Sequence, residues 1–325
     1  MDAIFVIVRA VHIGALVVLT GGLVFAISIA GAAGDGSEGG WNRTSRRFSA
    51  LWLLLAIGSG LAWLGLEAET MSGQPLAQAL GRETLGTVLA ESDFGQVWLT
   101  RGALSLGLAA LLAVAARPSP TARRGVLVLC TIVAAALLAS LALVGHANAE
   151  HGTQRAIHLA ADAVHLLAAG AWLGTLVPLA MLLGRRSTAT DGPTLDAVAD
   201  AVHRFSSLGL LAVSALLVTG IVNASFTVAT IPALLNTDYG RLLLFKLAWV
   251  GGMLALAATN RTRLTPSLAD TNLAPSARAA AVARLRRSAV AEIAFGLAIV
   301  VVVGVLGRTM PASHSSAMAP TMRMH

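Results

Sequence analysis

The sequence predicts an all-α, polytopic integral membrane protein with eight transmembrane helices, built as two tandem parallel four-helix repeats. Three observations lead to this fold class. Of the 325 residues, 56% are hydrophobic and only 12% are charged, with a mean hydropathy of +0.76, which is far more apolar than a soluble domain. Eight apolar runs are long enough to cross a bilayer, which takes about 20 residues. Several short motifs also occur twice, in the same order.

The apolar runs set the order of the predicted spans. The first run lacks a basic n-region, is long, and is interrupted by Arg9 and His12, so we expect a retained helix and not a cleaved signal peptide. Between the second and third runs, residues 75–92 have apolar side chains at helical spacing but are too polar to cross, which predicts an amphipathic helix on the outer surface. The eight runs are residues 3–30, 48–66, 97–116, 125–145, 157–183, 205–228, 241–258 and 289–307.

Basic residues indicate the orientation of the chain. Arginines gather in or beside alternate loops, and such loops stay on the cytoplasmic side. Both termini are therefore expected on the outer side, where the connecting loops carry acidic residues. The net charge of +7 follows from this topology, and no nucleic-acid partner is expected. The arginines at the cytoplasmic end include Arg43, Arg46, Arg47, Arg123, Arg124, Arg185, Arg186, Arg261, Arg263, Arg286 and Arg287.

The repeated motifs divide the chain into two halves. An even number of spans per repeat makes the two halves parallel, related by an axis along the membrane normal. We predict a first membrane repeat over 1–155, including the outer amphipathic segment, a second over 156–308, and a tail over 309–325. The matching motifs are Ala10-Val11-His12-Ile13 with Ala163-Val164-His165-Leu166, Gly21–Val24 with Gly174–Val177, Arg47-Phe48-Ser49 with Arg204-Phe205-Ser206, and Asp93-Phe94-Gly95 with Asp238-Tyr239-Gly240.

Several function classes are excluded or disfavoured by what the sequence lacks. Cys130 is the single cysteine, so there is neither a disulfide framework nor a paired-cysteine metal or redox motif. The sequence has no phosphate-binding loop and no dinucleotide fingerprint. An ATP-driven pump is therefore excluded, and we expect a non-enzymatic protein.

The duplicated histidines His12 and His165 are the strongest functional signal. An ionisable side chain inside a span is costly and normally faces a cavity, a partner or an ion. At a rise of about 1.5 Å per residue, both lie roughly 12–14 Å below the outer surface, which predicts two imidazoles facing one shared metal centre. The alternative is that each imidazole bonds a neighbouring carbonyl and packs. Arg9, Arg101 and Lys246 are expected to reach headgroups or to pair with acids.

Further histidines gather around the fifth span. His158, Asp162 and His165 are spaced four and three residues apart, so they share one helix face. His146 and His151 lie in the preceding outer loop. Imidazole suits copper, zinc, iron and nickel, and Asp162 can orient a ligating histidine. The alternative is that the loop histidines are solvated and that His158 is interfacial.

The C-terminal tail adds thioether sulfur to these imidazoles. Because thioether sulfur selects Cu(I), copper becomes the leading metal. The alternative is a disordered tail, since Pro311 and Pro320 prevent a continuous helix. The possible tail ligands are Met310, His314, Met318 and Met322, followed by Met324 and His325.

Taken together, these residues resemble the copper resistance protein D (CopD) family of bacterial inner-membrane proteins. The resemblance implies a role in moving copper across the inner membrane, with a periplasmic copper-binding protein as partner. In that membrane the outer side is the periplasm, so both termini, which the arginines place on the outer side, are expected there. It implies His146, His158, Asp162 and His165 as functional positions. The motif that carries it is His146, then His158, Asp162, His165, Trp172 and Gly174, then Arg204-Phe205-Ser206, Asp238-Tyr239-Gly240, Lys246, Asn260-Arg261 and Glu292.

The resulting hypothesis is a copper permease with a His- and Asp-lined site in the outer half of the bundle. The tail and loop histidines would collect the copper ion, and His12 with His165 would form the midway site. The rival is a b-type cytochrome, in which His12 and His165 ligate haem b and the protein transfers electrons. A copper sensor or assembly factor is a third alternative, and the oligomeric state, including a homo-oligomer, is left open.

Overall fold

The structure is a computed structural model that describes residues 2–29, 43–115, 120–145, 152–188, 194–228 and 230–309. Within these ranges it is helical and contains no strand. Eight helices in the described ranges are long and apolar enough to cross a membrane. The prediction of an all-α, polytopic membrane protein with eight spans is therefore confirmed.

The first four spans begin with α1 (Asp2–Ser28). They continue with α2 (Arg43–Ser72), α5 (Asp93–Ala115) and α6 (Pro120–Ala139), which the 3₁₀ turn η2 (Ser140–Val144) extends. Because α1 is apolar on nearly all sides, it lies inside the bundle. It contacts α2 and α6, and also α8 (Thr175–Thr188) and α13 (Pro275–Leu306), so it is the central helix of the molecule.

The last four spans include two helices with π-helical turns. The fifth span runs from α7 (Gly152–Ala169) through the π turn η4 (Gly170–Gly174) into α8 (Thr175–Thr188). The sixth span is α9 (Leu195–Thr227). The seventh runs from α11 (Asp238–Thr259) through the π turn η5 (Asn260–Leu264) into α12 (Thr265–Ala269). The eighth span is α13 (Pro275–Leu306). π turns of this kind often lie at functional sites.

Two glycines let α1 and the fifth span touch backbone to backbone. A Cβ on Gly21 would overlap the backbone of Gly174, and a Cβ on Gly174 would overlap the carbonyl of Val17. The Thr175 hydroxyl donates to the Gly21 carbonyl at 3.3 Å across the same contact. Small residues at such crossings are what allow helices to associate closely in lipid. Gly21 and Gly174 occupy matching positions of the repeated motif.

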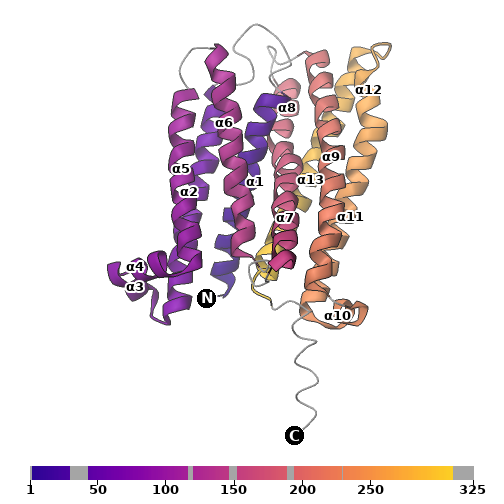
Figure 1. Cartoon of the computed structure of the whole chain (residues 1–325). Helices are drawn as coiled ribbons and strands as arrows, with labels where there is room; N and C mark the ends of the chain where they lie inside the picture. Colours follow the sequence, from indigo (N-terminus) through magenta and orange to yellow (C-terminus); the bar gives the residue numbers. More distant parts are fainter. Residues whose placement is uncertain are drawn as a thin grey trace.

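Short surface helices lie at the end of the bundle that carries the N-terminus (Figure 1). They are α3 (Leu76–Ala79), α4 (Arg82–Glu91) and α10 (Ile231–Asn236). Ala79 and Val88 pack against Ala68 of α2, so α3 and α4 cover the side of the first half. The prediction of surface helix over 75–92 is confirmed, and α12 lies at the opposite end (Figure 1).

Candidate metal site

The polar face of α7 packs against α9, and we call this contact the α7–α9 seam. Its members on α7 are the three residues that the sequence placed on one face, His158, Asp162 and His165. Each of the three meets a different residue of α9. The pairs are His158 with Phe226, Asp162 with Asn223, and His165 with Thr219.

His165 is held in one tautomer by a chain of hydrogen bonds. The Thr219 hydroxyl donates to the Ala215 carbonyl at 2.6 Å, which leaves its oxygen free to accept. The 3.0 Å contact between His165 Nδ1 and Thr219 Oγ1 is therefore an N–H donated by the imidazole. Nε2 then carries no proton and presents its lone pair, the form of imidazole that ligates a metal.

Asp162 lies one turn before His165 and has both polar and charged neighbours. Asn223 Nδ2 donates to Asp162 Oδ1 at 3.4 Å. Lys246 of α11 attracts the carboxylate through its charge, and so does Arg9 of α1, whose charge interacts more strongly with Glu67. Asp162 therefore lies in the field of cations from two other helices.

His158 lies at the end of the seam nearest the start of α7. Its side chain is buried, and the imidazole stacks on Phe226 with ring centroids 4.5 Å apart and an angle of 6° between the planes. The imidazole is therefore enclosed by protein. An aromatic contact of this kind fixes the plane of the ring next to Asp162.

His12 has a different environment, in which both ring nitrogens are occupied. Arg101 donates from Nη2 to His12 Nε2 at 2.6 Å. Because a guanidinium has no acceptor, Nε2 is the unprotonated nitrogen. The proton on Nδ1 is then donated to the Ala56 carbonyl at 2.9 Å and to Ser59 Oγ at 3.1 Å. No lone pair of His12 remains for a metal while Arg101 is in place.

The two imidazoles do not meet at a shared centre. His12 faces α2 and α5, whereas His165 faces α9, where Gly220 lies beside its ring. The expectation of one midway site formed by His12 with His165 is corrected here: each ring is turned toward helices of its own half. The physical reason is that α1 offers its polar contacts to Ser59 and Arg101, which hold His12 away from α7.

Arg101 also corrects an expectation from the sequence. It does not reach toward lipid headgroups: its side chain is only 4% exposed. Besides His12, it donates to the Leu137 carbonyl at 3.0 Å and to Ser140 Oγ at 2.5 Å, and it lies over the Trp98 ring at 5.0 Å. Polar groups of α6 and η2 therefore bind the guanidinium charge of Arg101.

The first half also lacks the other residues of the seam. Counting back from His12 at the spacing that separates His165, Asp162 and His158, α1 carries Arg9 and Phe5. Arg9 donates to the Gly307 carbonyl at 3.0 Å and lies over Trp63. A cation and a phenyl ring cannot ligate a metal, so the potential ligands are concentrated in the second half.

The described residues hold no group of three or more His, Cys, Asp or Glu side chains close enough to bind a metal ion. The predicted ligands His146, His151, Met310, His314, Met318 and Met322 lie outside the described residues. Thr219, Asn223 and Phe226 of α9 were not predicted from the sequence. Their spacing of four and three residues, with an asparagine in an apolar span, was the available signal.

Comparison with known proteins agrees with this architecture. The family model described as Copper resistance protein D-like, N-terminal domain matches residues 1–156, and that described as Copper resistance protein D matches 199–306. A protein named Copper resistance protein D from Pseudomonas syringae pv. tomato is 30% identical over 231 residues, covering 68% of this chain and 73% of the relative.

The chain belongs to the copper resistance protein D family.

Two further relatives extend the comparison within this family. Inner membrane protein YebZ of Escherichia coli (strain K12) is 30% identical over 69% of this chain and 71% of its own length. Copper transport protein CutJ of Bacillus subtilis (strain 168) is 28% identical over 61% of this chain, which spans only 36% of that relative. No solved structure matches. This member of the family is a multi-pass inner-membrane protein.

Proposed function

We propose that this chain transports copper ions across the bacterial inner membrane, and that the copper ion passes along the α7–α9 seam. The observation that carries the proposal is the hydrogen-bond chain from His165 through Thr219 to Ala215, which leaves the lone pair of His165 Nε2 without a partner in the described part of the chain. The family supports copper as the ion, because relatives are named for copper resistance and copper transport.

The seam has the chemistry that copper transfer requires. Imidazole accepts copper in either oxidation state, and a carboxylate one turn away adds charge and a second ligand. His158, Asp162 and His165 follow one another along a single face, so copper would pass between them by ligand exchange. His146, His151 and the Met- and His-containing tail would capture copper from a periplasmic copper-binding protein, with both termini in the periplasm. No covalent chemistry is needed, so the protein acts as a transporter and not as an enzyme.

The cations near Asp162 interact with its carboxylate before copper binds. Without copper, the charges of Arg9 and Lys246 attract the carboxylate. An arriving copper ion would replace part of that attraction, and the two cations would oppose tight retention of the metal. A transport site needs this property, because an ion that binds too tightly does not leave.

The haem alternative finds no support in the described contacts. Axial ligation by two histidines requires both Nε2 lone pairs to point at one iron. His12 Nε2 already accepts from Arg101, and the two rings face different helices. Copper transport therefore remains the single function that we propose.

Copper binding and uptake by three variants test the proposal. His165→Ala and Asp162→Asn are expected to abolish copper uptake into proteoliposomes and to remove at least one bound copper ion. His12→Ala is the control: it removes an imidazole at the matching position of α1 and should leave the copper stoichiometry unchanged. An absorption spectrum of each purified protein tests for haem.

Two results would overturn the proposal. The first is copper uptake that persists in both His165→Ala and Asp162→Asn. The second is a red protein whose Soret band disappears in His165→Ala, which would establish the cytochrome instead.

A further inference from the structure

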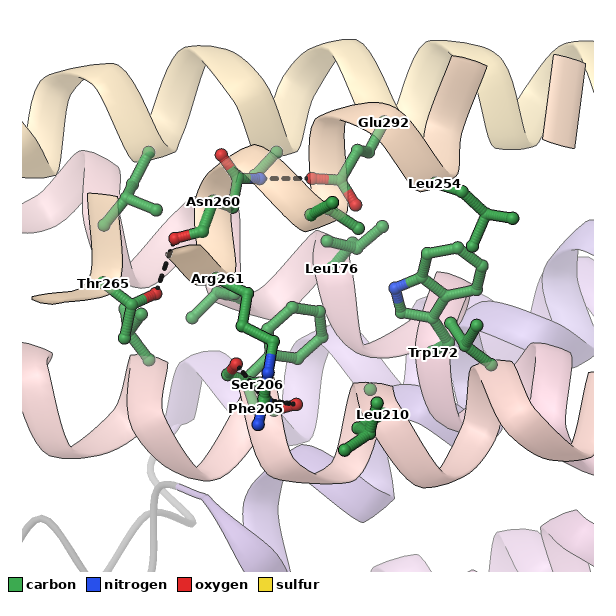
Figure 2. Close-up of a pocket in the computed structure, with 18 of the residues that line it drawn as sticks. Trp172, Leu176, Phe205, Ser206, Leu210, Leu254, Asn260, Arg261, Thr265 and Glu292 are labelled. Atoms are coloured by element: carbon green, nitrogen blue, oxygen red, sulfur yellow. Dashed lines mark hydrogen bonds between the residues drawn. The ribbon is translucent and has the colours of Figure 1, made fainter. Parts of the chain in front are cut away.

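A second polar site lies within the last four spans, in a cavity away from the seam. The cavity has a volume of about 230 Å³ and lies between α8, α9, α11 and α13, with η5 and α12 beside it. Its walls are mainly apolar and include Trp172, Leu176 and Phe205. Figure 2 shows Glu292 and Asn260 projecting among these side chains.

Glu292 is buried in this cavity with one oxygen unused. The side chain is 1% exposed. Asn260 Nδ2 contacts Glu292 Oε1 at 2.6 Å, and Glu292 Oε2 has no hydrogen-bond partner among the described residues. An ionised carboxylate with a bare oxygen in an apolar wall is costly, whereas a neutral carboxylic acid is not.

The partner of Glu292 can serve both protonation states. An asparagine side chain offers an NH₂ group to a carboxylate, and after a half-turn of the amide it offers its oxygen to a carboxylic acid. Asn260 Oδ1 is buried and has no partner in the described part of the chain, so no other bond holds that oxygen in place. Asn260 begins the π turn η5, where the Thr265 hydroxyl donates to its main-chain carbonyl at 3.0 Å.

Few charges face Glu292. Of the residues that line the cavity from α8, α9, α11, η5, α12 and α13, only Arg261 carries another titratable side chain. Arg261 is exposed and donates to the Ser206 carbonyl and hydroxyl at 2.9 and 2.8 Å, and Figure 2 shows it directed toward Ser206. Arg286 of α13 lies beside Gly184. Among the described residues, no ion pair to Glu292 is formed.

From the buried carboxyl, its adaptable asparagine and the cavity that reaches both, we infer that Glu292 is a proton-binding site that couples copper movement to protons. The cavity gives a proton access to Oε2, and Asn260 stabilises the site with the proton bound or released. The coupling rests on the proposed copper transport, whereas the proton site does not. The site is separate from the α7–α9 seam, so copper and proton would occupy different places.

Infrared spectroscopy of the copper-free protein tests the proton site. A protonated Glu292 gives a carboxylic-acid carbonyl band that shifts in D₂O. We expect this band in the wild-type protein, its loss in Glu292→Gln, and its retention in Glu83→Gln, which removes an exposed carboxyl of α4. Asn260→Leu should keep the band but move it, because the acid loses its hydrogen-bond partner. A wild-type spectrum without the band, or a band that survives in Glu292→Gln, would overturn the inference.

Copper uptake at a series of pH values tests the coupling. Wild-type proteoliposomes should show uptake that changes with pH, and Glu292→Gln should remove most of that dependence while Glu83→Gln keeps it. An unaltered pH profile in Glu292→Gln would overturn the coupling. If wild-type vesicles take up no copper at any pH, the transport proposal and the coupling fail together, and the infrared band still decides whether Glu292 binds a proton.

Discussion

At the residue scale, the hydrogen bonding of the imidazole Nε2 distinguishes His12 from His165, although the two histidines occupy equivalent positions in the sequence motif. Arg101 occupies Nε2 of His12, whereas Thr219 binds the Nδ1 proton of His165 and leaves Nε2 open. The same residue type in the same motif is therefore a structural group on α1 and a potential ligand on α7. Partners contributed by α2, α5 and α9 decide which role each histidine has.

Thr219→Val should weaken copper binding without removing any ligand. The variant keeps the shape of the side chain but loses the oxygen that fixes the His165 tautomer, and the loss of such an orienting partner typically costs about 10- to 100-fold in metal affinity. Copper titration of the purified protein measures the change. Thr259→Val is the matched control, since the Thr259 hydroxyl donates to the Ala255 carbonyl and touches no imidazole. Equal affinities in the two variants would contradict the role of Thr219.

Arg101→Met should destabilise the first half of the bundle. It leaves His12 Nε2 without its donor, whereas the Leu137 carbonyl keeps the Ser140 hydroxyl as a donor, and an unsatisfied buried group costs about 1–3 kcal/mol. Thermal unfolding in detergent should show a lower midpoint than for Arg241→Met, which removes an exposed arginine 4.0 Å from Asp238. A midpoint equal to that of the control would mean that Arg101 is not a structural donor.

At the element scale, α1 and the fifth span depend on a close crossing. Gly174→Ala places a Cβ against the Val17 carbonyl, so the two helices must separate, and overpacking of this kind costs about 1–3 kcal/mol. Gly102→Ala is the control, because a Cβ on Gly102 of α5 meets nothing within 4 Å. The midpoint of thermal unfolding should fall in Gly174→Ala and stay unchanged in Gly102→Ala. Equal stability in both variants would refute the crossing.

The elements themselves were largely predictable from the sequence. The length of each apolar run fixed the eight spans, because a segment of this length and composition has no stable place outside the bilayer. The surface helices α3 and α4 were predicted from their spacing. The π turns η4 and η5 were not, because an extra residue in a helical turn leaves no mark on hydrophobic periodicity. The cavity that contains Glu292 lies beside η5, so its geometry could not be predicted from the sequence either.

At the scale of the whole molecule, the arginines gather in alternate loops at one end of the bundle, and this predicts that the other end, with both termini, faces the periplasm. The helix α4, which contains Glu83, lies at the end that carries the N-terminus, and α12, which Asp270 follows directly, lies at the other end (Figure 1). In a Cys130→Ala background, Glu83→Cys should react with a membrane-impermeant maleimide added from the periplasm, and Asp270→Cys should not. The reverse pattern would place both termini in the cytoplasm.

The sequence alone determined the membrane class, the number of spans, the helix face shared by His158, Asp162 and His165, and the family resemblance that the comparisons confirmed. All of these depend on composition or on spacing along one helix, which the chain itself fixes. The tertiary structure decided that His12 and His165 face different helices, that α9 completes the seam, and that Asn260 meets Glu292. These pairings depend on how helices rotate about their own axes when they pack, and in an apolar bundle the local sequence leaves that rotation undetermined.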